Sequence, residues 1–123
     1  MKELTKAEEQ VMQVLWELEK AFVKDILQMM PKPKPAYSTV STIIRILETK
    51  GFVAHEAFGP THRYYPVVKK DNYSFFTTKN VINKYFDGSM QKMLSFFADK
   101  KEININEMEE IIKLLEKIKN QKK

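Results

Sequence analysis

Residues 36–51, AYSTVSTIIRILETKG, carry the clearest structural pattern of the sequence. Its apolar residues recur at positions i, i+3, i+4 and i+7, which is the stripe of an amphipathic helix. They are Val40, Ile43, Ile44 and Leu47. Gly51 follows the last turn and accepts the left-handed conformation that commonly ends a helix. The pattern predicts a helix from about Tyr37 to Lys50.

The opposite face of this helix carries small hydroxyls and one cation. Serine and threonine lower helix propensity, and an ordinary solvated face would use Glu, Lys and Gln. Small donors and acceptors beside one arginine suit close approach to base edges and phosphates of DNA. We therefore expect base contacts from this face. The predicted base-contacting residues are Ser38, Thr39, Ser41, Thr42 and Arg45.

The segments around this helix predict a winged helix-turn-helix. Thr5 and Glu8 form a capping-box pattern at the start of a helix over residues 6–19, and a shorter helix over 23–30 ends at Pro31. Residues 52–56 and 62–67 have the composition of strands and flank a turn at 58–61. The order of three helices and a hairpin within 66 residues defines this class, and residues 1–70 are expected to form the DNA-binding domain.

Charge is concentrated in the middle third of the chain. The net charge is −2 over residues 1–31, +5 over 32–70 and +2 over 71–123, which gives the total of +5. A basic segment around the predicted helix favours a polyanionic partner. The connector Pro31–Pro35 is stiff and carries two lysines, so it is either a plain linker or a phosphate contact. The predicted phosphate contacts are Lys32, Lys34, Tyr37, Thr49, His62, Arg63, Lys69 and Lys70.

The composition disfavours most enzymes. The 123 residues include no Cys, three Gly and two His, which excludes thiolate chemistry and leaves little for a phosphate loop or a metal site. His55 and His62 face each other across the hairpin in this reading, but two imidazoles without a third ligand make a weak metal site. We expect no enzyme activity, cofactor or metal. The chain has no secretory signal or membrane-spanning run, so a cytoplasmic location is expected.

Residues 71–123 predict a helical region of a different character. Helices are expected over residues 71–86 and 90–98, and a last helix ends near 119 after a cap at Asn104 or Asn106. These helices carry more large apolar side chains than about fifty residues can enclose alone. Either a second copy covers them or they pack on the winged helix of the same chain, and we favour the dimer. The predicted interface is Phe75, Phe76, Ile82, Phe86, Met93, Leu94, Phe97, Ile111, Ile112 and Leu115.

Three blocks of the sequence resemble the family of penicillinase and methicillin-resistance repressors. They are LTKAEEQVMQVLW over residues 4–16, YSTVSTIIRILETKGFV over 37–53 and RYYP over 63–66. The tail with Phe86-Asp87-Gly88-Ser89 is similar to the dimerisation region of that family. The resemblance covers residues 4–118 and implies a homodimeric repressor that lays residues 37–50 into the major groove of a palindromic double-stranded operator.

The resemblance also implies a means of induction. In this family a membrane-bound sensor with a zinc metalloprotease domain triggers cleavage of the repressor between its dimerisation helices, and the matching pair here is Phe96-Phe97, where well-known members resemble Asn-Phe. A copper-responsive branch of the family carries a C-terminal cysteine metal motif, and this branch is excluded because the chain has no Cys. Where the family carries Arg just before the Leu of the third helix, this chain has Ile46, preceded by Arg45. A shift of one residue turns a side chain by about 100°. The alternative function is a winged-helix module that binds proteins.

Overall fold

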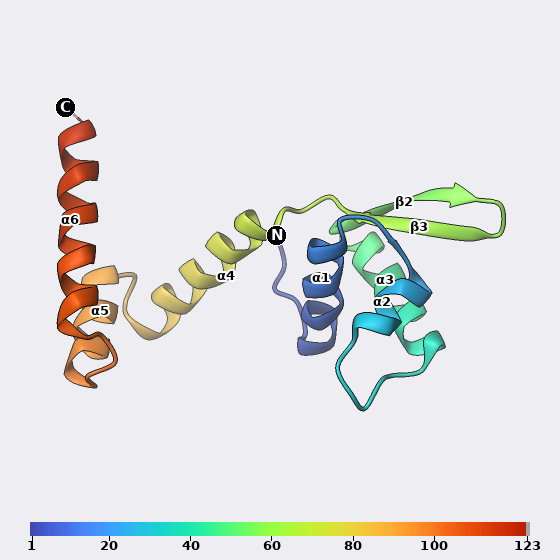
Figure 1. The fold of residues 1–123 in the computed structure, drawn as a ribbon, viewed down its shortest axis with the longest axis horizontal. Helices are drawn as coiled ribbons and strands as arrows, with labels where there is room; N and C mark the ends of the chain where they lie inside the picture. The colour runs from blue at the N-terminus through green and yellow to red at the C-terminus, as the bar shows by residue number, and fades with distance from the viewer. Residues whose placement is uncertain (123) are drawn as a thin grey trace. The chain divides into compact units, whose positions relative to one another are not determined.

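Three helices and a small antiparallel sheet form the N-terminal part of the chain in the computed structural model, which describes residues 1–122 (Figure 1). The chain divides into one unit over Met1–Thr77 and a second from Thr78 onward. In the first unit the hairpin projects past the three helices. The elements are α1 (Lys6–Leu18), β1 (Ala21–Phe22), α2 (Val23–Met29), α3 (Tyr37–Thr49), β2 (Val53–Phe58) and β3 (Thr61–Pro66).

Helix α1 begins as the sequence predicts. The Glu8 amide donates to Thr5 Oγ1 at 3.2 Å, and the Thr5 amide donates to Glu8 Oε1 at 2.9 Å, so the capping box is confirmed. Val11, Met12 and Leu15 follow at helical spacing and are fully buried. The cap fixes where the helix starts, and the apolar stripe fixes which side faces the core.

The sheet has the order β1-β3-β2, with both pairs antiparallel. The predicted hairpin is confirmed: Phe58 pairs with Thr61 around a turn at Gly59-Pro60, where Gly59 has a φ of 60°. The strands run 53–58 and 61–66 rather than 52–56 and 62–67. The strand β1 was not predicted from the sequence; its two residues pair with Tyr64 and Arg63 of β3. A two-residue strand has no periodicity of its own, so only the pairing reveals it.

The core of the first unit lies between the helices and the base of the sheet. Helix α3 contributes Val40, Ile44 and Leu47, all with no exposed surface, and Phe52 packs beside them at 1% exposure. Trp16 is partly buried against this core, and its Nε1 donates to the Val68 carbonyl at 2.9 Å. The buried stripe of α3 holds its polar face outward.

Helix α4 (Lys70–Tyr85) begins in the first unit and continues into the second. Tyr73 is 4% exposed, and its hydroxyl accepts a hydrogen bond from the Leu4 amide at 2.9 Å. Phe76 also packs against the core of the first unit. The two compact units divide after Thr77, within α4, and Phe76 lies partly buried in the first of them.

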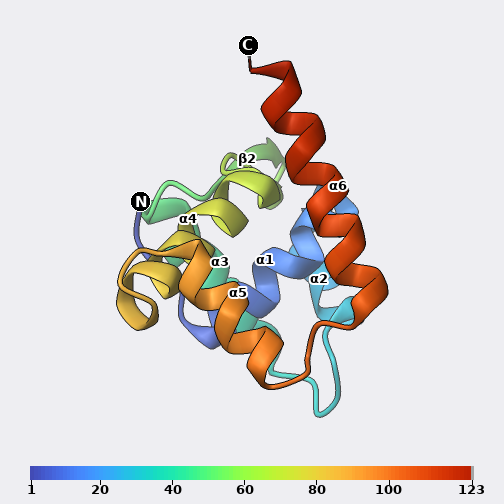
Figure 2. The ribbon, with the colours of Figure 1, turned by 90° about the vertical axis from the view of Figure 1, so that its left-hand side faces the viewer.

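The second unit continues with α5 (Met90–Asp99) and α6 (Ile105–Gln121), two helices joined by a short link (Figure 2). Asn104 Oδ1 accepts from the Glu107 amide at 2.7 Å, which selects Asn104 over Asn106 as the cap. Ile82, near the start of this unit, is 6% exposed in the single chain. Within the described residues no helix has the length and apolarity needed to cross a bilayer.

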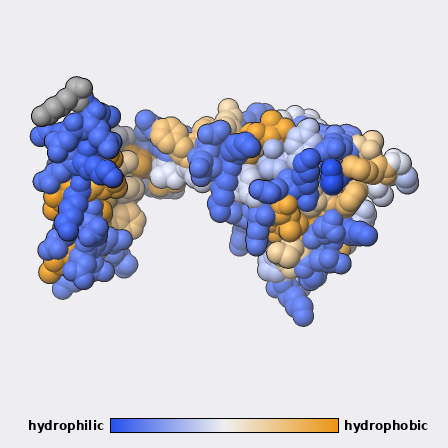
Figure 3. Space-filling model, turned by 45° about the horizontal axis from the view of Figure 1, so that its top comes forward, coloured by the Kyte–Doolittle hydropathy of each residue, from blue (hydrophilic) through white to orange (hydrophobic). Residues whose placement is uncertain are grey.

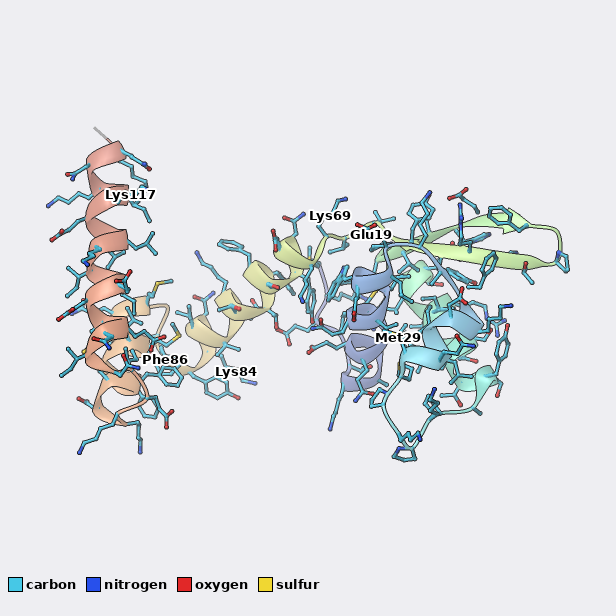
Figure 4. All side chains as sticks on the ribbon, in the orientation of Figure 1. Glu19, Met29, Lys69, Lys84, Phe86 and Lys117 are labelled. Carbon is cyan, nitrogen blue, oxygen red and sulfur yellow. The ribbon has the colours of Figure 1, made fainter. Side chains whose placement is uncertain are left out.

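The other apolar side chains of the second unit are largely exposed. Figure 3 shows hydrophobic side chains at the surface among the hydrophilic residues of α5 and α6. Met93, Leu94 and Ile111 are half-buried, whereas Ile112 and Leu115 are 54% and 55% exposed. Phe86, labelled in Figure 4, has its ring 5.7 Å from that of Phe96 and 6.4 Å from that of Phe97. These helices have apolar faces without a closed core.

Candidate nucleic-acid interface

The outward face of α3 carries the predicted base-contacting residues. Ser38, Thr39, Thr42 and Arg45 are exposed and Ser41 is half-buried. On the other side of the helix Val40, Ile44 and Leu47 are fully buried and Ile43 is partly buried. The exposed face offers hydroxyl, methyl and guanidinium groups at one helical surface. Such groups match the donors, acceptors and thymine methyls of a major groove.

Several of these side chains bond to their own helix. Thr42 Oγ1 donates to the Ser38 carbonyl at 2.9 Å, and Thr49 Oγ1 donates to the Arg45 carbonyl at 3.1 Å. Arg45 Nε donates to the Ser41 carbonyl at 3.2 Å. In this arrangement the two threonines present methyl groups and oxygen lone pairs rather than a free hydroxyl hydrogen. Arg45 retains further N–H donors, because a guanidinium carries five.

A hollow between α3 and the wing brings together predicted residues from separate elements. It has a volume of about 470 Å³. Tyr37, Ser41 and Arg45 line it from α3, and His62 lines it from β3. The remaining lining residues are Phe22, Val23, Lys24, Pro60, Thr61 and Tyr64. This grouping joins predicted base contacts and predicted phosphate contacts at one surface.

Lys24 in this hollow was missed by the sequence analysis. It lies on the exposed side of α2, in the residues 1–31 whose net charge is −2. The net charge of residues 1–31 is negative, so it did not indicate Lys24, which the fold places in the same hollow as residues of α3. The available signal was its position on α2, the first helix of the helix-turn-helix.

Other predicted phosphate contacts lie elsewhere. Lys69 and Lys70 line a different hollow, of about 960 Å³, together with Trp16 and other residues of α1 (Figure 4 labels Lys69). Lys34 Nζ donates to the Gln28 carbonyl at 2.8 Å, which ties the connector to α2. Lys32 is exposed on the same connector. Their contacts with phosphate stay predictions.

Arg63 is engaged within the wing. Its Nη2 lies 3.5 Å from Glu56 Oε2, its guanidinium carbon lies 4.7 Å from the centre of the Phe58 ring, and its Nε is buried without a hydrogen-bond partner. Glu56 also accepts from Lys20 at 3.2 Å, and these cations lower the pKa of its carboxyl. Contact between Arg63 and a phosphate would therefore compete with Glu56.

Lys50 forms an ion pair within the fold. Its ammonium lies 2.8 Å from both carboxylate oxygens of Glu8, and so ties the end of α3 to the start of α1. Burial raises the pKa of Glu8, but the hydrogen bonds from Lys50 and the Thr5 backbone outweigh it, and the net result is a lowered pKa. Among the ion pairs of residues 1–122, none involves Lys24, Arg45 or Lys69, which stay available to an anionic partner.

The two histidines meet as the sequence predicts. The rings of His55 and His62 are stacked, with centroids 4.0 Å apart and planes 7° apart. His55 Nδ1 lies 2.6 Å from Glu48 Oε2 of α3. Across the described residues no three His, Asp or Glu side chains gather as a metal site would require.

A helix-turn-helix with a two-stranded wing defines the class: this is a winged-helix DNA-binding protein. A family model described as penicillinase repressor matches residues 4–117, so the chain belongs to the penicillinase repressor family. The family is one of transcriptional repressors rather than enzymes.

Named relatives span the same length. The methicillin resistance regulatory protein MecI of Staphylococcus aureus is 28% identical over 116 residues, which cover 94% of each chain. The penicillinase repressor of Bacillus licheniformis is 24% identical over 122 residues, 98% of this chain and 95% of its own. A solved structure of the CopR repressor is 29% identical over 55% of this chain and all of its own, with a TM-score of 0.46.

Proposed function

We propose that this chain is a homodimeric repressor that binds a palindromic operator by placing α3 in the major groove of each half-site. The hollow that joins α3 to the wing carries this proposal. Arg45 and Ser41 line it beside Tyr37, His62 and Lys24, so groups suited to base edges and to phosphates share one surface.

The dimer has support in the second unit. Ile112 and Leu115 lie on α6 and are each more than half exposed, and Phe96 and Phe97 on α5 are 49% and 39% exposed. Apolar surface of this extent is typical of an interface rather than of a solvated helix. A second copy that covers α5 and α6 would link two winged helices, and the linked pair would bind two half-sites at a high effective concentration.

The proposal includes induction by proteolysis within this same region, residues of α5. The partner in this proposal is a membrane-bound zinc metalloprotease sensor, and the cut falls between Phe96 and Phe97. A cut there would separate all of α6 from the winged helix, and the dimer would be lost. The bond lies inside α5, so the helix would have to open locally before a protease could reach it.

The first experiment tests sequence reading with Ser41→Ala and Arg45→Ala. Loss of a base contact is expected to cost about 1–3 kcal/mol on the operator and much less on random DNA. Lys6→Ala is the matched control, because it removes an exposed cation that lines neither hollow. DNA upstream of the gene for this chain is the probe, measured by gel retardation over a range of salt concentrations.

The proposal fails if the full chain binds operator and random DNA equally, or if both variants lose affinity equally on the two DNAs. A chain that sediments as a monomer while binding its operator tightly would contradict the dimeric part alone. The cleavage step is tested by mass spectrometry of the chain recovered from induced cells, where intact protein during full induction would contradict it.

A further inference from the structure

The hollow between α3 and the wing has the size and the lining of a small-molecule site. Its volume of about 470 Å³ lies within the range of about 300–1,000 Å³ that is usual for ligand pockets. Aromatic rings from three elements form much of its wall, namely Phe22 of β1, Tyr37 of α3, and His62 and Tyr64 of β3. Such rings favour a planar aromatic molecule, which packs against them face to face or edge to face.

Tyr64 brings a polar group without a partner to this hollow. The residue is only 5% exposed, yet its hydroxyl forms no hydrogen bond with any of the residues 1–122. Burial, with Glu48 nearby, raises the pKa of the phenol, so the hydroxyl keeps its proton and can donate it. Buried hydroxyls are normally hydrogen-bonded, because desolvation without a partner costs free energy. An acceptor that enters the hollow would supply the missing partner.

The charges around the hollow favour an anionic occupant. Lys24 and Arg45 line it, and within the described part of the chain no carboxylate does. Neither cation takes part in an ion pair among residues 1–122. Arg45 bonds to its own helix through Nε, which leaves other guanidinium donors for a ligand. The larger hollow beside α1 differs, because Glu17 and Glu19 line it together with lysines.

We propose that the hollow between α3 and the wing binds a planar aromatic carboxylate, and that this ligand and the operator exclude each other. The rings hold the aromatic part of the ligand. The carboxylate accepts hydrogen bonds from the Tyr64 hydroxyl and the Arg45 guanidinium, and the ammonium of Lys24 adds a favourable charge. The inference rests on the proposed DNA-binding function and adds a ligand and a regulation to the same surface.

Exclusion follows from the residues that the two partners share. Ser41 and Arg45 are predicted base contacts, and both line the hollow. A ligand held there occupies the donors of Arg45 and the space between helix and wing that faces the DNA. Because the two partners need the same groups, a ligand at ten times its dissociation constant lowers the apparent operator affinity about tenfold. Such a ligand would release the repressor without cutting the chain.

The first test measures ligand binding to the full chain without DNA. The probe is 2-naphthoate, and 2-naphthamide is the uncharged molecule of the same shape. Isothermal titration calorimetry is expected to show one site per chain, with a dissociation constant of about 1 mM for a molecule of this size. The amide should bind at least about tenfold more weakly, because it lacks the charge that pairs with Arg45. Equal affinities, or no binding of naphthoate at about tenfold higher concentration, would overturn the inference.

The second test locates the site with matched variants. Tyr64→Phe keeps the ring and removes only the hydroxyl, so naphthoate affinity should fall about tenfold with the lost hydrogen bond to a charged acceptor. Tyr65→Phe is the control, because this neighbour on β3 lines the other hollow and should leave the affinity unchanged. If the two variants bind alike, the probe lies elsewhere, such as on the apolar faces of α5 and α6, and the inference is overturned.

Lys24→Gln repeats this test at a position outside the core. Lys24 is exposed, so its replacement leaves the buried side chains in place, and naphthoate affinity should again fall. Lys6→Gln is the matched control, because it removes an exposed cation that lines neither hollow. A loss of the same size in both variants would show a general effect of net charge and would contradict a site in the hollow.

The third test measures competition by fluorescence anisotropy of labelled DNA from upstream of the gene. Naphthoate at ten times its measured dissociation constant should lower operator affinity about tenfold, and naphthamide at the same concentration should have little effect. In Tyr64→Phe the same naphthoate concentration should lower it only about twofold, whatever the affinity of this variant without ligand. Unchanged operator affinity with bound naphthoate would overturn the inference while DNA binding stands. If no specific DNA binding occurs without ligand, the proposed function itself has failed, and calorimetry still decides whether the hollow binds the carboxylate.

Discussion

The two units of this chain use apolar residues in opposite ways. Of the sixteen apolar side chains that are buried among residues 1–122, fifteen belong to the first unit and only Ile82 to the second. Helices from several directions close around the base of a sheet in the first unit. The second unit has α5 and α6, whose apolar faces have too few neighbours to enclose them. A domain core and an assembly surface can thus be built from the same residue types.

The two units are therefore expected to respond differently to substitutions. A closed core loses stability when a methyl group is removed, because the surroundings cannot fully relax into the space. An exposed apolar face loses little stability in one chain, but it loses association when a charge is placed on it. Predictions for the two units therefore concern different measurements.

The largest effect is expected from Leu115→Glu on α6. A charge at this exposed apolar position should prevent dimerisation and lower operator affinity by about 10²–10⁴-fold, because the two half-sites are no longer linked. Asn120→Glu places the same charge on an exposed polar position of the same helix and should change neither property. Sedimentation and gel retardation measure both. A dimeric Leu115→Glu chain would remove α6 from the interface.

The next largest effect is a difference in unfolding free energy between two leucine-to-alanine substitutions, one in each unit. In the Leu115→Glu background, Leu47→Ala in the first unit should cost about 2–5 kcal/mol of unfolding free energy, and Leu114→Ala in the second should stay within about 0.5 kcal/mol. Leu47 has no exposed surface, whereas Leu114 is 55% exposed. Urea unfolding followed by circular dichroism gives both values. Equal losses would show that the second unit has a closed core after all.

A smaller effect concerns Glu8 at acid pH. Its pKa is lowered in the folded state from 4.5, so the stability it contributes is present above pH 4.5 and is lost as the pH falls through the lowered value. Glu8→Gln should cost about 1–3 kcal/mol at pH 7, between the values for exposed and buried ion pairs. It should also flatten the decline in stability below pH 4.5.

Glu9→Gln controls for the lost charge, because Glu9 lies in the same first turn of α1 and is exposed. Both variants remove a negative charge near the helix N-terminus, and only Glu8→Gln removes the contact with Lys50. Unfolding as a function of pH separates them. Identical curves would mean that the ion pair between α1 and α3 contributes nothing.

The smallest effect concerns the lysines of the first unit. Lys69→Ala and Lys70→Ala should each reduce the slope of log affinity against log salt by roughly 0.9 if each loses one phosphate contact, with equal losses on operator and random DNA. Lys117→Ala in the second unit should leave the slope unchanged. Since both lysines line a hollow with α1 rather than with α3, unchanged slopes would confine the DNA contacts to the surface around Arg45.

The sequence alone determined the features that depend on neighbours in the chain. The capping box at Thr5, the amphipathic stripe of α3, the end of that helix at Gly51 and the hairpin turn at Gly59 follow from local geometry and helical or strand periodicity. The polar face of α3 followed as well, because burying one side of a helix fixes the other.

Contacts between residues that are distant in the sequence became known from the packing of the elements. The pairing of β1 with β3, the contact of Lys50 with Glu8, the engagement of Arg63 by Glu56 and the packing of Phe76 on the first unit join segments that sequence spacing does not connect. The contacts of His55 with Glu48 and with His62 likewise depend on the sheet register and the position of α3 together. Periodicity shows which side of an element is apolar, but the partner of each side chain is set by how the elements pack.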